Sequence, residues 1–351
     1  RGYGIAWTWL AIFLPGLVLA VTVHECGHWA AARWRGMIVS QVVIGWLEIQ
    51  PRRRGVRLRL VRGMTSGVRG YVLAYPGADR DMRRDLTWFA LGGPIASLFA
   101  AVGCGMVAWQ LGRSSAQSAW LLWGLLHLLG CVLNLIPRKL SNAMATDGLI
   151  WARARLNRFD ALPGAAFLEI QGRILRGAPV RDLPTELLRR LLDEPEPMPS
   201  MHGWLWVHAA LEAQDLDDAD KRFEALRARI GELDPPMQLA LAGLLAMVRV
   251  DLAFAHAIEQ GEGGALTALD PLSLDAPGYW YAPHVPPRVR ALAAALRGDA
   301  VEARRQLARA QRYAENSPCD FIVLSEAQLR ERIEAIIERS PPSSSASRQT
   351  A

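Results

Sequence analysis

The chain has 351 residues, 51% of them hydrophobic, and lysine and arginine outnumber aspartate and glutamate by 40 to 34. The net charge of +6 is better explained by contact with anionic lipid than by nucleic acid, because no basic patch is interleaved with aromatic residues. The four cysteines have no paired spacing, which argues against a disulfide framework and a cysteine zinc finger. We therefore predict no nucleic-acid partner and no thiolate metal site.

The first long apolar run extends from Ile5 to Ala32 and ends at Arg33 and Arg35. About 20 apolar residues suffice to cross a bilayer as a helix, so we predict a first span at about residues 5–32, interrupted at Pro15-Gly16. The run is too long for a signal peptide and has no small-residue cleavage site. The chain begins with Arg1 and not with Met, so residues could precede it.

The pentapeptide His24-Glu25-Cys26-Gly27-His28 lies inside this run. Residues four apart share one face of a helix, so both histidines can bind one metal ion while Glu25 takes a proton from an attacking water. Cys26 lies off that face and is not expected to be a ligand. The alternative is a helix with two histidines and no metal, but a carboxylate at membrane depth is costly unless it is paired or functional. The membrane setting therefore favours a metal site.

The link after the first span predicts a β-hairpin at about residues 39–61. Val39–Ile49 and Val56–Val61 are the expected strands, and the turn at residues 51–55 joins them into a hairpin with one apolar and one basic face. A third strand is expected from Gly67 to Tyr75. Such a hairpin can lie at the membrane surface, and the alternative is an ordinary hairpin that only seals the site.

Two further apolar runs predict spans at about residues 86–111 and 119–136. Many arginines lie in the link between the first and second spans, whereas the link between the second and third offers Arg113 alone. Positive charge favours the cytoplasmic side of a membrane. We therefore expect the metal end of the first span, and everything after Ile136, to face the cytoplasm.

Small residues at Gly92-Gly93-Pro94 predict that the second span packs closely against another helix. We favour this reading over the alternative that Pro94 loosens the helix for a substrate, and we expect no role beyond packing for Ser97. His127 in the third span lies toward the far side of the membrane from Asn134 and is predicted to be a packed or water-contacting residue and not a ligand.

A catalytic zinc ion needs a third protein ligand besides the two histidines. The third span ends in Asn134-Leu135-Ile136-Pro137, and Asp147-Gly148 follows after a polar stretch. Pro137 stops the span, so the chain can loop back and bring a carboxylate to the first helix. Asp147 is therefore the candidate third ligand. An N-cap of the following helix is the alternative role, and the two roles are compatible.

The sequence becomes polar and helix-periodic after about Trp151. We expect a helical connector at residues 153–198, an α-helical soluble domain at 199–336 and a disordered tail at 337–351. The segment Ala291–Asp299 resembles part of a tetratricopeptide hairpin, and a plain helical bundle remains an equal alternative. This domain could bind a protein partner.

The motifs together resemble the site-2 protease family of intramembrane zinc metalloproteases over roughly residues 5–152. The resemblance implies one zinc ion held by His24, His28 and Asp147, a water activated by Glu25, and Asn134 beside the site. The stretch from Pro137 to Asp147 is longer here than in many members of that family.

The expected fold is a mainly α membrane protein with a three-span metalloprotease core in residues 1–152, an interfacial β-hairpin or small sheet, and an α-helical soluble domain. The resemblance implies a multi-pass cell-membrane endopeptidase with a cytoplasmic C-terminal domain. Its substrates would be membrane proteins cut in or beside a transmembrane segment near the cytoplasmic face, in regulated proteolysis. The alternatives are an inactive relative that acts as a membrane scaffold through its helical domain, and a membrane metal transporter or sensor.

Overall fold

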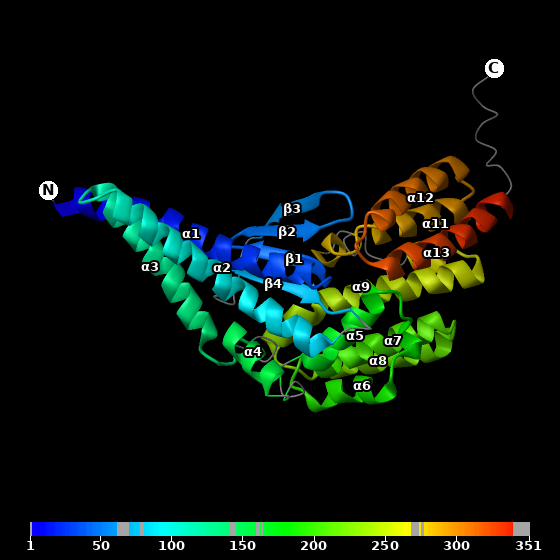
Figure 1. The fold of residues 1–351 in the computed structure, drawn as a ribbon. Coiled ribbons are helices and arrows are strands. Elements are labelled where there is room, and N and C mark those ends of the chain that lie inside the picture. The colour runs from blue at the N-terminus through cyan, green and yellow to red at the C-terminus, as the bar shows by residue number, and fades with distance from the viewer. Residues whose placement is uncertain are drawn as a thin grey trace, which may run out of the picture. The chain divides into compact units, whose positions relative to one another are not determined.

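The computed structural model describes residues 2–61, 70–77, 81–140, 145–156, 158, 162, 164–267, 274 and 277–339. The chain is mostly helical and divides into two compact units, residues 1–173 and 174–351. The helices and strands of the first unit (Figure 1) are α1 Gly2–Trp34, β1 Ile38–Ile44, β2 Leu47–Pro51, β3 Val56–Leu60, β4 Gly70–Tyr75, α2 Met82–Gln110, α3 Ser115–Leu135, α4 Asp147–Arg155 and α5 Ala165–Leu175, which runs across the boundary.

Within the described ranges, four helices are long and apolar enough to cross a membrane. Three of them, α1, α2 and α3, overlap the ranges predicted as spans. The fourth is α9, Pro235–Gln260, which the sequence analysis placed in the soluble domain. The expected interruption of the first span is wrong, because Pro15 lies inside a continuous α1. A proline removes one backbone hydrogen bond, and neighbouring helices can compensate for that loss in a membrane.

Helices α1 and α2 approach so closely that a side chain has no room at their crossing. A Cβ at Gly27 would lie 2.3 Å from the Gly92 carbonyl oxygen, and a Cβ at Gly92 would lie 2.5 Å from the Gly27 carbonyl oxygen. Small residues permit such backbone contact between apolar helices. The predicted packing role of Gly92 is therefore confirmed. An ion pair supports the same two helices near one end, where Arg35 Nη2 lies 2.7 Å from the fully buried Asp85.

The four strands form one antiparallel sheet in the order β3-β2-β1-β4. The prediction of one strand over Val39–Ile49 is wrong, because the chain turns between β1 and β2 at Gly45, whose φ of +58° suits a glycine. The predicted third strand is present as β4, and residues 67–69 at its expected start lie outside the described residues.

One face of the sheet is apolar and only partly covered. Its β1 and β4 residues, such as Val42 and Val72, are buried in a cluster with Ala32 of α1 and Phe89 of α2. On the edge strand β3, by contrast, Val56, Leu58 and Leu60 are 51%, 56% and 76% exposed. The opposite face is polar and partly enclosed, with Glu48 almost fully buried against Arg59, whose Nε donates to it at 2.7 Å.

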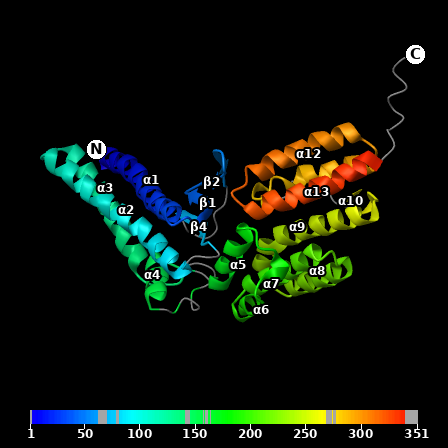
Figure 2. The same cartoon turned by 45° about the vertical axis from the view of Figure 1, so that its right-hand side comes forward.

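The second unit is helical throughout its described residues (Figure 2). Its helices are α6 Thr185–Arg189, α7 Met198–Glu212, α8 Leu216–Gly231, α9, α10 Gly264–Thr267, α11 Val285–Leu296, α12 Ala300–Glu315 and α13 Asp320–Arg339, with short 3-10 helices at Val180–Asp182, Arg190–Asp193 and Pro277–Trp280. The predicted tail begins too early, because residues 337–339 continue α13. Residues 340–351 lie outside the described residues.

A buried arginine ties three helices of the second unit together. The guanidinium of Arg288 in α11 pairs with Glu326 of α13 and lies 3.3 Å from Asp251 of α9. It also lies 4.7 Å from the centre of the Phe254 ring. A buried charge is tolerated only when it is paired, so these contacts specify how the helices must align.

We predict that Gly92→Ala destabilises the protein, because the new methyl group would overlap the α1 backbone. Overpacking of this kind lowers the free energy of unfolding by about 1–3 kcal/mol. Denaturant unfolding of the detergent-purified chain, followed by circular dichroism, measures the change. The matched control is Gly103→Ala in the same helix, where a Cβ would meet nothing within 4 Å. Equal stability of the two variants would contradict the predicted overlap.

Candidate metal centre

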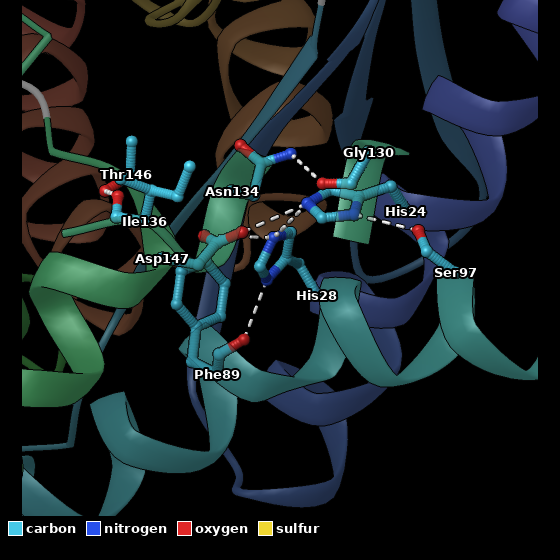
Figure 3. Close-up of polar contacts among 9 residues, drawn as sticks. All are labelled: His24, His28, Phe89, Ser97, Gly130, Asn134, Ile136, Thr146 and Asp147. Carbon is cyan, nitrogen blue, oxygen red and sulfur yellow. Dashed lines mark hydrogen bonds and ion pairs between the residues drawn. The ribbon is translucent and has the colours of Figure 1, made fainter. Parts of the chain in front are cut away.

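Three side chains from two helices meet at one point (Figure 3). The Nε2 atoms of His24 and His28 in α1 lie 3.2 Å apart. Asp147, the first residue of α4, places Oδ2 3.1 Å from His24 Nε2 and Oδ1 3.3 Å from His28 Nε2. The structure thus brings together the three residues that the sequence analysis named as ligands.

The other ring nitrogen of each histidine contacts α2. His28 Nδ1 lies 2.7 Å from the backbone oxygen of Phe89 and can only donate to it. His24 Nδ1 lies 3.0 Å from the hydroxyl of Ser97. A protonated Nδ1 leaves the Nε2 of the neutral ring with a free lone pair, which is the form that binds a metal. The α2 contacts therefore orient both rings toward the common point.

The two Nε2 atoms and the two carboxylate oxygens of Asp147 form contacts of 3.1–3.3 Å, and facing lone pairs at this distance repel one another unless a proton or a metal ion lies between them. Both histidines are buried, so water cannot screen that repulsion well. In the metal-free site, burial would raise the pKa of Asp147, but attraction to protonated His28 and hydrogen bonds from both histidines outweigh it and lower the pKa to about 2. An ionised carboxylate and two imidazoles can hold a metal ion.

Local backbone geometry brings Asp147 to this point. A Cβ at Gly148 would lie 2.0 Å from the backbone oxygen of Leu135, so only glycine lets the start of α4 lie against the end of α3. The hydroxyl of Thr146 donates a hydrogen bond to the Ile136 backbone oxygen at 2.7 Å, which joins the two ends of the loop between α3 and α4. The alternative role of Asp147 as an N-cap is wrong, because Thr146 occupies the N-cap position.

Gly93 of α2 lies directly against the Nε2 atoms of both histidines. A Cβ at this position would lie 2.4 Å from His28 Nε2 and 2.7 Å from His24 Nε2. Any larger residue would therefore fill the space where the three ligand atoms converge.

Glu25 is buried beside the histidines, between α1 and the start of β4. Its Oε2 atom has no hydrogen-bond partner among the described residues. A Cβ at Gly70 would lie 2.6 Å from Glu25 Oε1, so the strand backbone approaches the carboxylate directly. A buried carboxylate with an unused oxygen next to three ligands is suited to accept a proton.

The remaining candidates have different surroundings. Asn134 has no hydrogen bond to the three ligands in the part of the chain that the structure describes, and its Nδ2 donates to the Gly130 oxygen at 2.9 Å. His127 is buried, and its Nδ1 has no described partner. Cys26 is exposed.

The sequence analysis missed several supporting residues. The expectation that Ser97 only packs is wrong, since its hydroxyl contacts His24. Its position four residues after Gly93 was the available signal, because the two share a helix face. The close approach of Gly70 to Glu25 could not be predicted from the sequence, because it depends on how β4 packs against α1.

Comparisons with protein-family models, with curated proteins and with solved structures give no match to this chain. We therefore infer its function from the geometry of the site.

We predict that the purified chain carries close to one metal ion and that His28→Ala and Asp147→Ala each lose most of it. Gly93→Ala should also lose the ion, because its methyl group would occupy the ligand-lined space. Elemental mass spectrometry of detergent-purified protein measures metal per chain, with Gly103→Ala as the matched glycine control. Full retention of metal in Asp147→Ala would exclude this carboxylate as a ligand.

We further predict that Ser97→Ala weakens metal binding without preventing it. Loss of a group that orients a ligating histidine typically costs about 10–100-fold in metal affinity. Competition with a chelator of known affinity provides the measurement. Ser118→Ala, at an exposed position of α3, is the control. Equal affinities would show that Ser97 does not orient His24.

Proposed function

We propose that this chain is a zinc metallopeptidase of the site-2 protease type, which hydrolyses peptide bonds of membrane proteins inside or beside the bilayer. The observation that carries the proposal is the convergence of His24, His28 and Asp147, whose contacting atoms lie 3.1–3.3 Å apart, with the buried carboxylate of Glu25 beside them; Oε2 of Glu25 has no hydrogen-bond partner among the described residues. An apolar helix presents this group, which matches a reaction in a membrane.

The donor set fits zinc. Zinc prefers tetrahedral sites built from imidazole nitrogens and carboxylate oxygens, and catalytic zinc sites use three protein ligands. Bond lengths of 2.0–2.1 Å would place tetrahedral ligand atoms about 3.3 Å apart. The two Nε2 atoms lie 3.2 Å apart, and each lies 3.1–3.3 Å from one of the two oxygens of Asp147, so each of these pairs is close to that spacing. Calcium and magnesium prefer oxygen-rich sites, so two imidazoles disfavour them.

Each of these residues has its own role in the proposed reaction. His24, His28 and Asp147 would hold the ion, which as a Lewis acid activates water and polarises a carbonyl group. Glu25 takes the proton of the attacking water and delivers it to the leaving amine, as a general base and then a general acid. Asn134 uses one amide hydrogen in its bond to Gly130 and keeps a second, which we propose it donates to the developing oxyanion.

The membrane arrangement follows from three helices and the arginines. We propose that α1, α2 and α3 form the three-span core and that the second unit, including α9, lies in the cytoplasm. The apolar side chains of α9 support this placement, because Val248, Leu252 and Phe254 are buried in clusters with neighbouring helices. The arginine-rich link between α1 and α2 supports a cytoplasmic position for the metal end of α1.

The sheet supplies a surface for the substrate. Paired residues of neighbouring strands share a face, and one row crosses the sheet from Leu60 through Leu47 and Ile44 to Gly70. Gly70 borders Glu25, so this row connects the exposed apolar strand β3 with the proposed base. We propose that an unwound segment of a membrane-protein substrate reaches the site along this sheet.

We predict that Glu25→Gln keeps the metal and abolishes cleavage, because the amide has the shape of the carboxylate but cannot take a proton. Loss of a general base lowers the rate by about 10²–10⁴-fold. The assay co-expresses each variant with a panel of single-span membrane reporters and detects the released fragments by immunoblot. Cys26→Ala, at the next and exposed position, is the control and should cleave as wild type does.

Two results would count against the proposal. Normal cleavage by Glu25→Gln would exclude Glu25 as the base. A wild-type chain that binds its full complement of metal but cuts no reporter would favour the scaffold alternative.

A further inference from the structure

A second candidate site lies entirely within residues 174–351. It is a pocket of about 650 Å³ that α7, α8 and the segment from α6 into the following 3-10 helix enclose. Figure 2 shows α7 and α8 side by side. Binding pockets for small ligands and peptide side chains range over about 300–1,000 Å³. No lining residue belongs to the metal centre.

The floor of the pocket comes from matching faces of two helices. Gly203 and Trp206 lie on the pocket face of α7, and Ala225 and Leu226 lie on that of α8. A Cβ at Gly203 would lie 3.1 Å from Leu226 Cδ1, so the missing side chain lets the two helices pack closely beneath the pocket. The floor is therefore apolar and firmly supported.

The charged groups of the lining are all positive. Arg189, Arg222 and Arg229 line the pocket, and no acidic residue does. Arg222 lies 4.4 Å from the centre of the Trp206 ring and donates its Nε to Asp218 at 2.5 Å. Arg229 pairs with Glu196 through Nε at 2.8 Å and Nη2 at 2.6 Å. These carboxylates lie outside the lining, and they hold two guanidinium groups in place while leaving other N–H groups free.

Two further donors lack an internal acceptor. Arg189 pairs with no acidic residue in the described chain. Trp206 Nε1 donates to His202 Nε2 at 2.6 Å, which assigns the ring proton of neutral His202 to Nδ1. Burial, together with the nearby Arg229 and Arg222, lowers the pKa of His202 and keeps the ring neutral at pH 7. Its Nδ1–H meets no acceptor among the described residues, so the pocket offers donors to a ligand from several directions.

We propose that this pocket binds an acidic peptide segment of a partner protein, with a large apolar side chain on the floor and a neighbouring carboxylate against the arginines. The apolar floor favours an apolar group, and the N–H groups that Arg222, Arg229 and Arg189 keep available favour an anion. A free inorganic anion would leave the floor uncovered, and an apolar compound would leave Arg189 unpaired. The site would give the protein a means of recognising partners that is independent of the proposed peptidase.

The test uses the full chain in detergent micelles and a synthetic library of octapeptides with Asp, Lys, Ser, Leu or Phe at each position. We expect immobilised protein to retain peptides in which Asp lies within three residues of Leu or Phe. Calorimetric titration of the most enriched peptide then gives its dissociation constant.

Two matched pairs of variants locate the binding. Arg189→Gln and Ala225→Phe should each weaken binding about tenfold or more, by removing a charged donor and by filling the floor. Arg227→Gln and Ala228→Phe change residues of α8 outside the pocket lining and should bind as wild type does. Arg189 is exposed and makes no ion pair with the described residues, so we expect its replacement to leave the fold intact.

Three outcomes would overturn the proposal. The first is a library with no retained peptide, and the second is retention without preference for Asp. The third is equal loss of binding in Ala225→Phe and Ala228→Phe, because the peptide would then bind elsewhere or the helix would have unfolded. Zinc content is measured in parallel and should not change in any of the four variants.

Discussion

The contact between the α1 and α2 backbones is the constraint on which the metal centre depends. Gly27 and Gly92 remove the side chains that would hold these helices apart. At that separation three residues of α2 at four-residue spacing reach α1, because they share one helix face. The Phe89 oxygen orients His28, Gly93 leaves space for the ligand atoms, and Ser97 contacts His24. The second helix thus supplies no metal ligand and yet determines where both histidines point.

The sequence predicted the parts of the site that repeat at fixed spacing along one helix. His24 and His28 are four residues apart, and any continuous helix must place them on one face. Asp147 could be named because it is the first carboxylate after the third span, but its approach depends on Gly148 lying against Leu135. That contact joins two helices across a loop, and spacing alone does not reveal it. The turn at Gly45 was missed for a similar reason, since the apolar residues on both sides resemble one continuous strand.

The sheet also shows that a sequence pattern alone does not predict which face of a strand is buried. The alternation in β3 correctly predicted an apolar and a basic face, but alternation is the same whichever face is buried. The apolar face is buried where Val42 and Val72 meet α1 and α2, whereas Leu58 and Leu60 of β3 on the same face are exposed. Which face is buried depends on what surrounds the sheet. The strand sequence alone does not contain that information. Lipid against the exposed part of the apolar face would account for these side chains.

The exposed edge of β3 has a consequence for handling the protein outside a membrane. A free strand edge beside an apolar face is a template for pairing with another chain. In a bilayer, hydrocarbon would cover the apolar face and keep copies apart, whereas a small detergent micelle centred on the long helices would leave β3 in water. Two extracted copies could then join edge to edge into a continuous sheet. Dimers of purified protein that disappear when lipid is restored would therefore report the loss of lipid, and not the oligomeric state of the protein in its membrane.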